Sequence, residues 1–368
     1  MKESYKIFVI NPGSTSTKLA LFSNEKKLYE TNVFHDAGEL LRYESVNAQL
    51  PYRHRVIMDF LKEDNIDLTD VDAIVGRGGS CLPVRSGVYE VNDLLIADTA
   101  AFKGGMEHPS NLGVQLAREM QKEYGGRAFM VDPCCVDELC DMARMTGIKG
   151  VDRHVNMHTL NMRGVAMHHA KTVEKRPYPD CRFIVCHIDG GISISAHEDG
   201  HIIDCNNSGG GEGPYSPTRI GTVSAADLID YCKGKDLDEV RKLAIRTGGF
   251  VSHFGTSSSD TVHAMMDRGD KQAARVWNGM LYQICKTVGA MAAVLCGRVD
   301  AILLTGGLLR FPDVEEYIRA HCGWIGPIYT YPGEVEHEAM AAGALRVLRG
   351  EEEAKTYTGI PAWTGWDD

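Results

Sequence analysis

Residues 7–22 read IFVINPGSTSTKLALF, and a similar pattern returns at residues 184–198 as IVCHIDGGISISAHE. Each stretch is a short apolar run, a glycine-containing turn and a second apolar run, which predicts a hairpin of two buried β-strands. The turn glycines correspond: Gly13 in the first copy, Gly190 and Gly191 in the second. The spacing of about 175 residues far exceeds the roughly 20–50 residues of a solenoid repeat, so the pattern predicts two duplicated domains.

Strand and helix patterns alternate along the rest of the chain, which indicates an α/β protein. Asp199–Gly200 predicts a second turn and a third strand after the later hairpin. Successive hairpins of this kind mean that the sheets are mixed, unlike the parallel sheet of a dinucleotide-binding fold.

The proline-rich, charged stretch at residues 175–180 marks the predicted division between domains. The expected parts are an N-terminal domain over residues 1–175, a C-terminal domain over 176–335, a closing helix over 336–352 and a tail over 353–368. Gly350 ends the closing helix, and the tail shows no clear period, so we expect it to lack order.

Composition narrows the class of protein. The 368 residues carry 39 basic and 50 acidic side chains, a net charge of -11, which argues against binding nucleic acid or an anionic membrane surface. The 11 cysteines show no CxxC spacing and lie mostly in apolar runs, as expected for free thiols in a reducing compartment. The charged N-terminus is unlike a signal peptide, and no apolar run approaches the roughly 20 residues of a membrane span. We therefore expect a cytoplasmic protein.

The first turn, NPGSTSTK at residues 11–18, is a candidate phosphate loop. Glycine lets the main chain approach an anion, and amides with small hydroxyls can bind phosphate oxygens. The candidate contacts are Asn11, Gly13, Ser14, Thr15, Ser16 and Lys18. Lys18 lies on the second strand and could point into the loop or away from it, and a plain hairpin turn is the alternative interpretation. Because the patterns GxxxxGK[ST] and GxGxxG are absent, the phosphate site must be of another kind.

Two more candidates lie in the first half of the chain. Arg77 follows a buried strand between glycines, a position suited to binding a carboxylate or phosphate, although a surface salt bridge is the simpler interpretation. His108 precedes Pro109 at a helix start, where it could polarise a carbonyl group or act only as a helix cap.

Three further candidates follow from position. Asp132 comes directly after a buried strand, where a carboxylate could hold Mg²⁺ or orient a substrate. His187 stands at the mouth of the second loop and could donate to a phosphoryl group, or be a buried structural histidine. Glu338 opens the last helix as a metal ligand or a partner of the helix dipole. The remaining candidate nucleotide contacts are Gly190, Gly191, Gly306 and Gly307.

Eight stretches, in this order, resemble the acetate, propionate and butyrate kinase family from about Tyr5 to Glu352. They are VINPGSTSTKLALF, VGRGG, EHPSNLG, VDPCCVDEL, CHIDGGISISAHEDGHIIDCNN, GEGPYSPTR, LLTGGLL and HEAMAAGALRVLRG. The resemblance implies two ribonuclease H-like, actin-type domains with a nucleotide cleft between them, and a closing helix over 336–352 that returns to the N-terminal domain. It also implies ATP or ADP, Mg²⁺, direct in-line transfer between ATP and a short-chain, butyrate-like fatty acid or its acyl phosphate, and a homodimer or larger assembly.

The resemblance further implies roles for the candidates. Asn11 would contact phosphate and, with Glu338, the metal; Arg77 would hold the carboxylate and Asp132 would orient it or the metal. His108 and His187 would hydrogen-bond the carboxyl or the moving phosphoryl group, and Gly306 and Gly307 would face the adenosine.

Two departures from the family pattern make the expected phosphate site more negative. Asp189 replaces a glycine of the second loop, and Asp260 occupies the place where the alignment puts the family's arginine. If the local alignment slips, Arg246 or Arg268 fills that role instead. The sequence therefore leaves two hypotheses: a carboxylate kinase, and a relative that binds nucleotide or acyl phosphate with little or no turnover.

Overall fold

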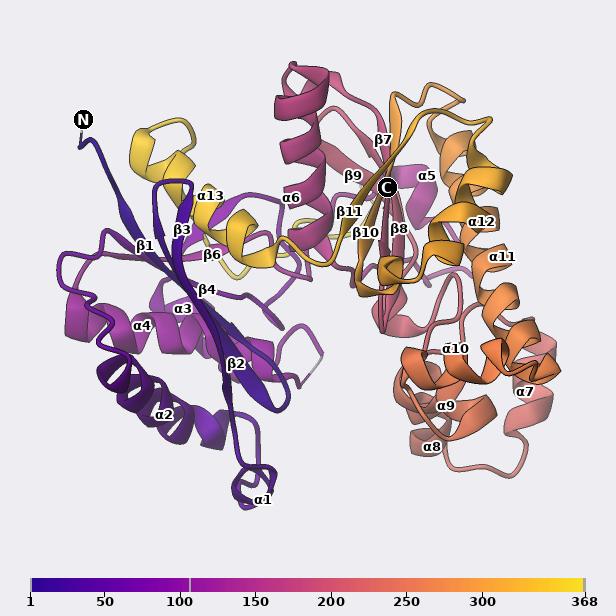
Figure 1. Ribbon diagram of the computed structural model, residues 1–368, viewed down its shortest axis with the longest axis horizontal. Helices are drawn as coiled ribbons and strands as arrows, with labels where there is room; N and C mark the ends of the chain where they lie inside the picture. The colour runs from indigo at the N-terminus through magenta and orange to yellow at the C-terminus, as the bar shows by residue number, and fades with distance from the viewer. Residues whose placement is uncertain (1, 106, 367–368) are drawn as a thin grey trace. The chain divides into compact units, whose positions relative to one another are not determined.

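The computed structural model describes residues 2–105 and 107–366. The chain divides into two compact units, seen in Figure 1. Unit 1 combines the residues up to Asp137 with those from Val335 onward, and unit 2 runs from Glu138 to Glu334. The division predicted after residue 175 lies within unit 2.

Within the described residues, unit 1 contains a seven-stranded sheet in the order β12-β5-β6-β4-β1-β2-β3. Its strands are β1 (Lys6–Pro12), β2 (Ser16–Ser23), β3 (Lys26–Phe34), β4 (Ala73–Gly76), β5 (Val88–Glu90), β6 (Arg127–Val131) and β12 (Lys355–Thr356). β1 pairs antiparallel with β2 and parallel with β4, so the predicted first hairpin is present in a mixed sheet.

Unit 1 also contains five α-helices among the described residues. They are α1 (Ala37–Leu40), α2 (Leu50–Glu63), α3 (Asp93–Ala100), α4 (Leu112–Tyr124) and α13 (Glu336–Arg349). α4 packs on β4, β6 and β1, with α2 against it, and Figure 1 shows α13 across the sheet from them. Gly76 and Gly113 permit the close approach of β4 and α4, because a Cβ on Gly76 would clash with the main chain of Gly113.

Unit 2 repeats the pattern. Its described sheet has the order β11-β10-β7-β8-β9, formed by β7 (Phe183–Ile188), β8 (Ile192–Glu198), β9 (His201–Cys205), β10 (Ala301–Gly306) and β11 (Ile328–Pro332). As in unit 1, the first three strands are antiparallel and the next one, β10, pairs parallel with the first. The prediction of an α/β protein with two mixed sheets is confirmed.

The helices of unit 2 are α5 (Asp141–Arg144), α6 (Thr159–His169), α7 (Ala225–Cys232), α8 (Leu237–Lys242), α9 (Gly249–Phe254), α10 (Ser259–Asp267), α11 (Lys271–Val294) and α12 (Pro312–Cys322). α6 contacts β7 and β10, whereas α11 contacts β7, β8 and β9. Asp270 caps α11 by accepting hydrogen bonds from the amides of Gln272 and Ala273 at 2.8 and 3.0 Å. The apolar stripe of α11, which includes Trp277 and Ile284, forms the core with the buried side chains of β7 and β8.

The tail is ordered in its described part, contrary to the expectation from its sequence. β12 pairs with the edge strand β5, and the buried Tyr357 donates to Asp98 Oδ2 at 2.8 Å. One aromatic anchor and a two-residue strand hold a segment that has no periodic pattern. None of the helices in residues 2–105 and 107–366 combines the length and apolar character needed to cross a membrane.

Candidate active site

The first polar cluster lies in unit 1, where three side chains meet. Asn11 comes from the end of β1, Arg77 follows β4, and Glu336 opens α13. Glu336 Oε2 accepts from Arg77 Nη1 at 2.6 Å and from Asn11 Nδ2 at 2.7 Å, and Arg77 Nη1 also donates to Asn11 Oδ1 at 3.2 Å. The Glu336 side chain is 4% exposed, whereas that of Arg77 is 26% exposed. The cluster therefore combines a buried anion with a cation that reaches solvent.

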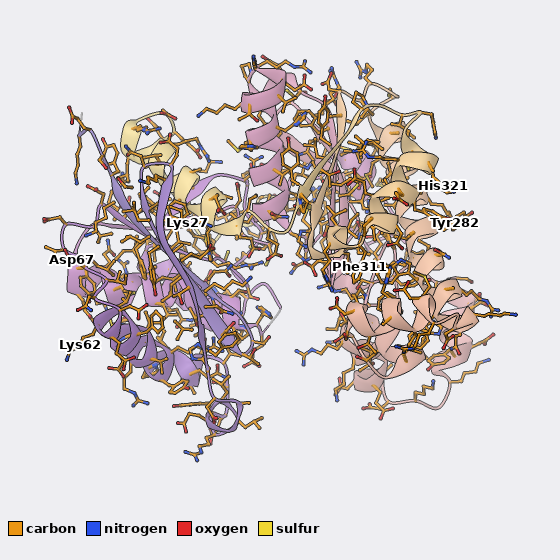
Figure 2. The ribbon with its side chains drawn as sticks, viewed as in Figure 1. Lys27, Lys62, Asp67, Tyr282, Phe311 and His321 are labelled. Carbon is orange, nitrogen blue, oxygen red and sulfur yellow. The ribbon has the colours of Figure 1, made fainter. Side chains whose placement is uncertain are left out.

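Glu338, the acid expected from the sequence, does not join this cluster. Its Oε1 pairs with Lys27 Nζ at 2.8 Å, and Figure 2 shows Lys27 beside α13. Residues two apart on a helix do not face the same way. Because Glu336 faces Asn11, Glu338 faces elsewhere, and the structure places Glu336 in the position that we expected for Glu338.

The first loop is a tight turn with a polar, accessible tip. Gly13 N donates to Ser16 O at 2.7 Å, and Ser14 and Thr15 are exposed. Lys18 is also exposed on β2, while its neighbour Thr17 is buried, so the two side chains lie on opposite faces of the strand.

His108 and Asp132 are held by local hydrogen bonds. His108 Nδ1 accepts from Ser110 N at 3.1 Å, so the histidine caps the short helix Pro109–Asn111. Asp132 is 3% exposed, and its Oδ1 accepts from Gly87 N at 2.7 Å. A φ of 38° at Asp132 is costly for a residue with a side chain, and such strain is concentrated at functional sites.

The second polar cluster lies in unit 2 at the end of β7. His187 is 1% exposed, and its Nδ1 is 2.9 Å from Asn161 Nδ2. Because an amide nitrogen can only donate, the neutral imidazole carries its proton on Nε2 and can donate from there. His158 stacks on His187 with ring centroids 3.9 Å apart and lies 2.9 Å from Ser193 Oγ. His158 was not among the residues expected from the sequence. Its position directly before α6 is the sequence feature that could have pointed to it.

Asp189 connects two glycine loops rather than adding a free charge. Its Oδ1 accepts from Gly190 N at 2.7 Å, and its Oδ2 accepts from Gly307 N at 2.8 Å. Gly306 has a φ of 108°, and a side chain there would clash with the main chain of Ile188. Side-chain nitrogen and oxygen atoms of His187, Asp189 and Glu334 lie within 4.8 Å of one another.

Arg219, also missed by the sequence analysis, lies against the second loop. A Cβ on Gly191 would overlap its guanidinium, so that glycine makes room for the arginine. Arg219 Nε and Nη1 are buried, and neither has a hydrogen-bond partner among the described residues. Burial lowers the pKa of Arg219. Two buried donor atoms without a partner are costly for a cation unless an anion accepts from them.

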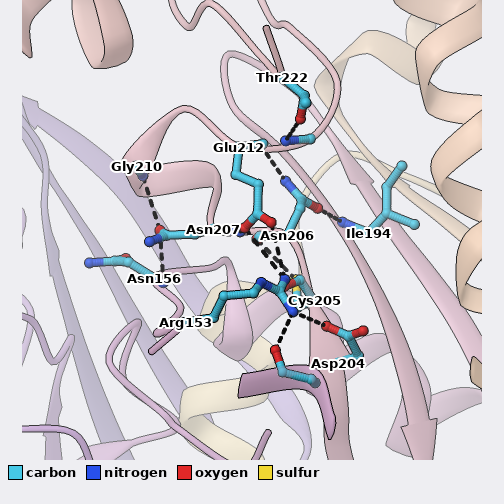
Figure 3. Close-up of polar contacts among 12 residues, drawn as sticks. Arg153, Asn156, Ile194, Asp204, Cys205, Asn206, Asn207, Gly210, Glu212 and Thr222 are labelled. Carbon is cyan, nitrogen blue, oxygen red and sulfur yellow. Dashed lines mark hydrogen bonds and ion pairs between the residues drawn. The ribbon is translucent and has the colours of Figure 1, made fainter. Parts of the chain in front are cut away.

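A polar network holds the loop that carries Arg219. Figure 3 shows Arg153 donating from Nη1 to Asp204 Oδ1 at 3.1 Å and from Nη2 to the Cys205 carbonyl at 3.0 Å. Asn206 Oδ1 accepts from Ile194 N at 2.8 Å, and its Nδ2 donates to the Glu212 carbonyl at 3.0 Å. The segment between β9 and Arg219 is thus fixed to the sheet at several points.

Asp260 lies on α10 and forms an exposed ion pair. Arg310 Nη2 and Nε donate to its carboxylate at 2.8 and 3.2 Å, and Arg310 Nη1 donates to the Gly307 carbonyl at 2.7 Å. The charge of Asp260 is therefore paired with that of Arg310.

Comparisons with known proteins agree with this architecture. Acetate kinase of Porphyromonas gingivalis superposes with a TM-score of 0.76 at 20% identity, covering 94% of this chain and 100% of that one. The fold is therefore that of the acetate kinases, with an actin-type arrangement in each unit.

Sequence relatives identify the family. Residues 144–312 match the acetokinase family. A probable butyrate kinase of Clostridium botulinum (strain Alaska E43 / Type E3) is 44% identical over 358 residues, 96% of this chain and 100% of the relative. Butyrate kinase 2 of Clostridium acetobutylicum is 42% identical over 355 residues, 96% of this chain and 99% of the relative. The chain belongs to the acetokinase family.

Proposed function

We propose that this protein transfers the γ-phosphoryl group of ATP to a short-chain, butyrate-like carboxylate, giving ADP and an acyl phosphate, and catalyses the reverse reaction. The observation that carries the proposal is Arg219, a half-buried cation whose buried Nε and Nη1 have no hydrogen-bond partner among the described residues, lie at a glycine loop and suit an anionic phosphoryl group. The relatives named as butyrate kinases suggest the acceptor.

The chemistry needs little beyond position and charge. A carboxylate oxygen attacks the γ-phosphorus, and the bond from that phosphorus to the bridging oxygen breaks, with its electron pair leaving on ADP. No general base is required, because the acid is already ionised at neutral pH. Catalysis then consists of alignment and of neutralising charge on the phosphoryl oxygens.

Unit 1 supplies the acceptor side. All side-chain hydrogen bonds of Arg77 within the described residues use Nη1, so its remaining guanidinium nitrogens are available to a substrate carboxylate. We assign orientation of that carboxylate to Asp132, a hydrogen bond to His108, and contact with phosphate to Asn11 and the tip of the first loop.

Unit 2 supplies the nucleotide and transfer side. Arg219, with His187 through Nε2–H and His158 stacked on it, would stabilise the phosphoryl group in transfer. Gly190 and Gly191 would let the phosphates approach the main chain, and Gly306 and Gly307 would face the adenosine.

Glu336 fits a role in binding Mg²⁺. Both hydrogen bonds to its carboxylate use Oε2, and Oε1 has no hydrogen-bond partner among the described residues. A hard cation such as Mg²⁺ binds to one or two carboxylate oxygens together with phosphate oxygens and water, and when bound it would neutralise phosphate charge. Asn11, whose Oδ1 accepts from Arg77, would complete this ligand group. We also propose a cytoplasmic protein that forms a homodimer or larger assembly, which light scattering can test.

The second hypothesis, a binding protein without turnover, depended on the absence of the family's arginine. Arg219 removes that reason, and the ion pair of Asp260 with Arg310 shows that the aspartate charge is balanced. The kinase is therefore the function that we favour.

Hydroxylamine trapping tests the proposal, because it converts an acyl phosphate into a coloured hydroxamate. Purified protein with ATP and Mg²⁺ should give hydroxamate with butyrate, at a higher kcat/KM than with acetate or hexanoate. Omission of ATP or chelation of Mg²⁺ should abolish the signal. ATP binding without hydroxamate from any acid between acetate and hexanoate would contradict the proposed function.

A further inference from the structure

Arg53 is a buried cation outside the groups assigned above. It lies on α2, and its residue exposure is 0%. Arginines are almost never fully buried unless they are paired, yet Arg53 makes no ion pair with a carboxylate among the described residues. Burial lowers its pKa to about 10, which leaves it charged at neutral pH.

The partners of Arg53 are main-chain carbonyl groups of the first loop. Nη1 donates to the Gly13 carbonyl at 2.9 Å, and Nη2 donates to the Ser14 carbonyl at 3.1 Å. Nε donates to Gln49 Oε1 at 3.1 Å, which fixes the plane of the guanidinium. One side chain therefore holds two successive peptide groups of the turn from behind.

This arrangement determines where the loop amides point. In a planar trans peptide, the N–H of one residue is antiparallel to the C=O of the residue before it. Because the carbonyls of Gly13 and Ser14 face Arg53, the amides of Ser14 and Thr15 point away from it. Both residues are exposed, and successive amides aimed outward form an anion-binding concavity.

His35 supports the same turn. Its amide donates to the Thr15 carbonyl at 2.9 Å, and its Nε2 lies 2.8 Å from Thr17 Oγ1. The loop is thus held along one side by Arg53 and His35, while the hydroxyl-bearing tip is left to a ligand.

We infer that Arg53 is a positioning residue for phosphoryl transfer: it holds two loop carbonyls so that the amides of Ser14 and Thr15 face a phosphate. The unpaired guanidinium charge behind the loop also favours an anion in front of it. The inference rests on the proposed kinase function for its identification of the phosphate as that of ATP or acyl phosphate.

The test compares Arg53→Lys and Arg53→Met with the matched control Arg55→Met. Arg55 lies on the same helix, is exposed, and contacts the ring of Tyr52. Lysine keeps the charge but lacks the fork that holds two carbonyls. Both Arg53 variants should lower kcat/KM for ATP by about 10- to 100-fold, the scale of a misplaced contact. KM for butyrate and the kinetics of Arg55→Met should stay near wild type.

The outcomes separate the inference from the function on which it rests. A purely structural role would reduce the folded fraction without shifting KM for ATP relative to KM for butyrate, and that result overturns the inference. If Arg53→Met does not fold, Arg53→Lys decides by the same comparison. If the wild type yields no hydroxamate, the proposed function fails; calorimetry with ATP then supports the inference if Arg53→Lys binds more weakly and overturns it if binding is equal.

Discussion

Replacing Glu336 with Gln removes one buried negative charge and keeps the shape of the side chain. In the structure, Oε2 accepts charge-assisted hydrogen bonds from Arg77 at 2.6 Å and from Asn11 at 2.7 Å. A hydrogen bond to a charged group contributes about 1.5–3 kcal/mol and a neutral one about 0.5–1.5 kcal/mol, so two weakened bonds cost roughly 2–3 kcal/mol. If that energy positions Arg77 for transfer, kcat/KM should fall about 30- to 160-fold, at about 1.36 kcal/mol per factor of ten.

Glu338→Gln is the matched control, because it removes the same charge two residues away, where the carboxylate pairs with Lys27. Hydroxamate formation would be measured for both variants across Mg²⁺ concentrations, with urea unfolding to check stability. Glu336→Gln should also need more Mg²⁺ for half-maximal rate, whereas Glu338→Gln should resemble wild type. A Glu336→Gln enzyme within about threefold of wild type, or an equal loss in both variants, would refute the assignment.

Three other changes test separate parts of the structure. Arg219→Met should lower kcat about 10³-fold or more without loss of stability, because Nε and Nη1 have no partner to lose; activity within tenfold would exclude Arg219 from the transfer step. Asp260→Asn should leave kcat within about twofold, since an exposed ion pair with Arg310 stabilises little; a large change in rate would place Asp260 in the site. Burial and the neighbouring Arg53 charge hold the pKa of His35 at about 4, below its value near 6.5 in the unfolded chain. As the pH drops from about 6.5 to about 4, the unfolded state therefore takes up the proton first, and the free energy of unfolding falls. His35→Gln should reduce the loss in the free energy of unfolding between pH 7 and about pH 4.5 by roughly 2 kcal/mol, as measured by urea unfolding. If that loss is the same in the variant and the wild type, His35 is not the responsible group.

The fold could be predicted because its signals are local. A buried run, a glycine turn and a second buried run specify a hairpin wherever they occur, and the copies around Gly13 and Gly190 both formed one. The order of the strands in each sheet depends on long-range pairing. The return of the last helix to unit 1 leaves no periodic mark in the sequence, and only the family resemblance predicted it. The ordered tail was missed for the same reason, because its anchor Tyr357 is a single residue.

Candidate site residues could be predicted from the sequence where they lie at the end of a buried strand. They were harder to predict where their position depends on the rotation of a helix or on the packing of a loop. Asn11 and Arg77 end buried strands, and the structure brings them together. Glu336 and Glu338 are two residues apart on α13, so the rotation of this helix about its own axis decides which acid faces Asn11. That rotation is set by packing and cannot be predicted from the sequence. Arg219 lies in a loop without a period, and its importance appears only from its burial beside Gly191.

The division of unit 1 between the two ends of the chain has a consequence for synthesis on the ribosome. Unit 2 is continuous, so it can fold as soon as its last residue has emerged, whereas unit 1 waits for α13 and β12. Arg77 and Glu336 are 259 positions apart. A nascent chain therefore carries Arg77 without its acid until translation is nearly complete, and a polypeptide that stops before α13 lacks the buried anion of the site. Only a chain that extends through α13 can assemble it.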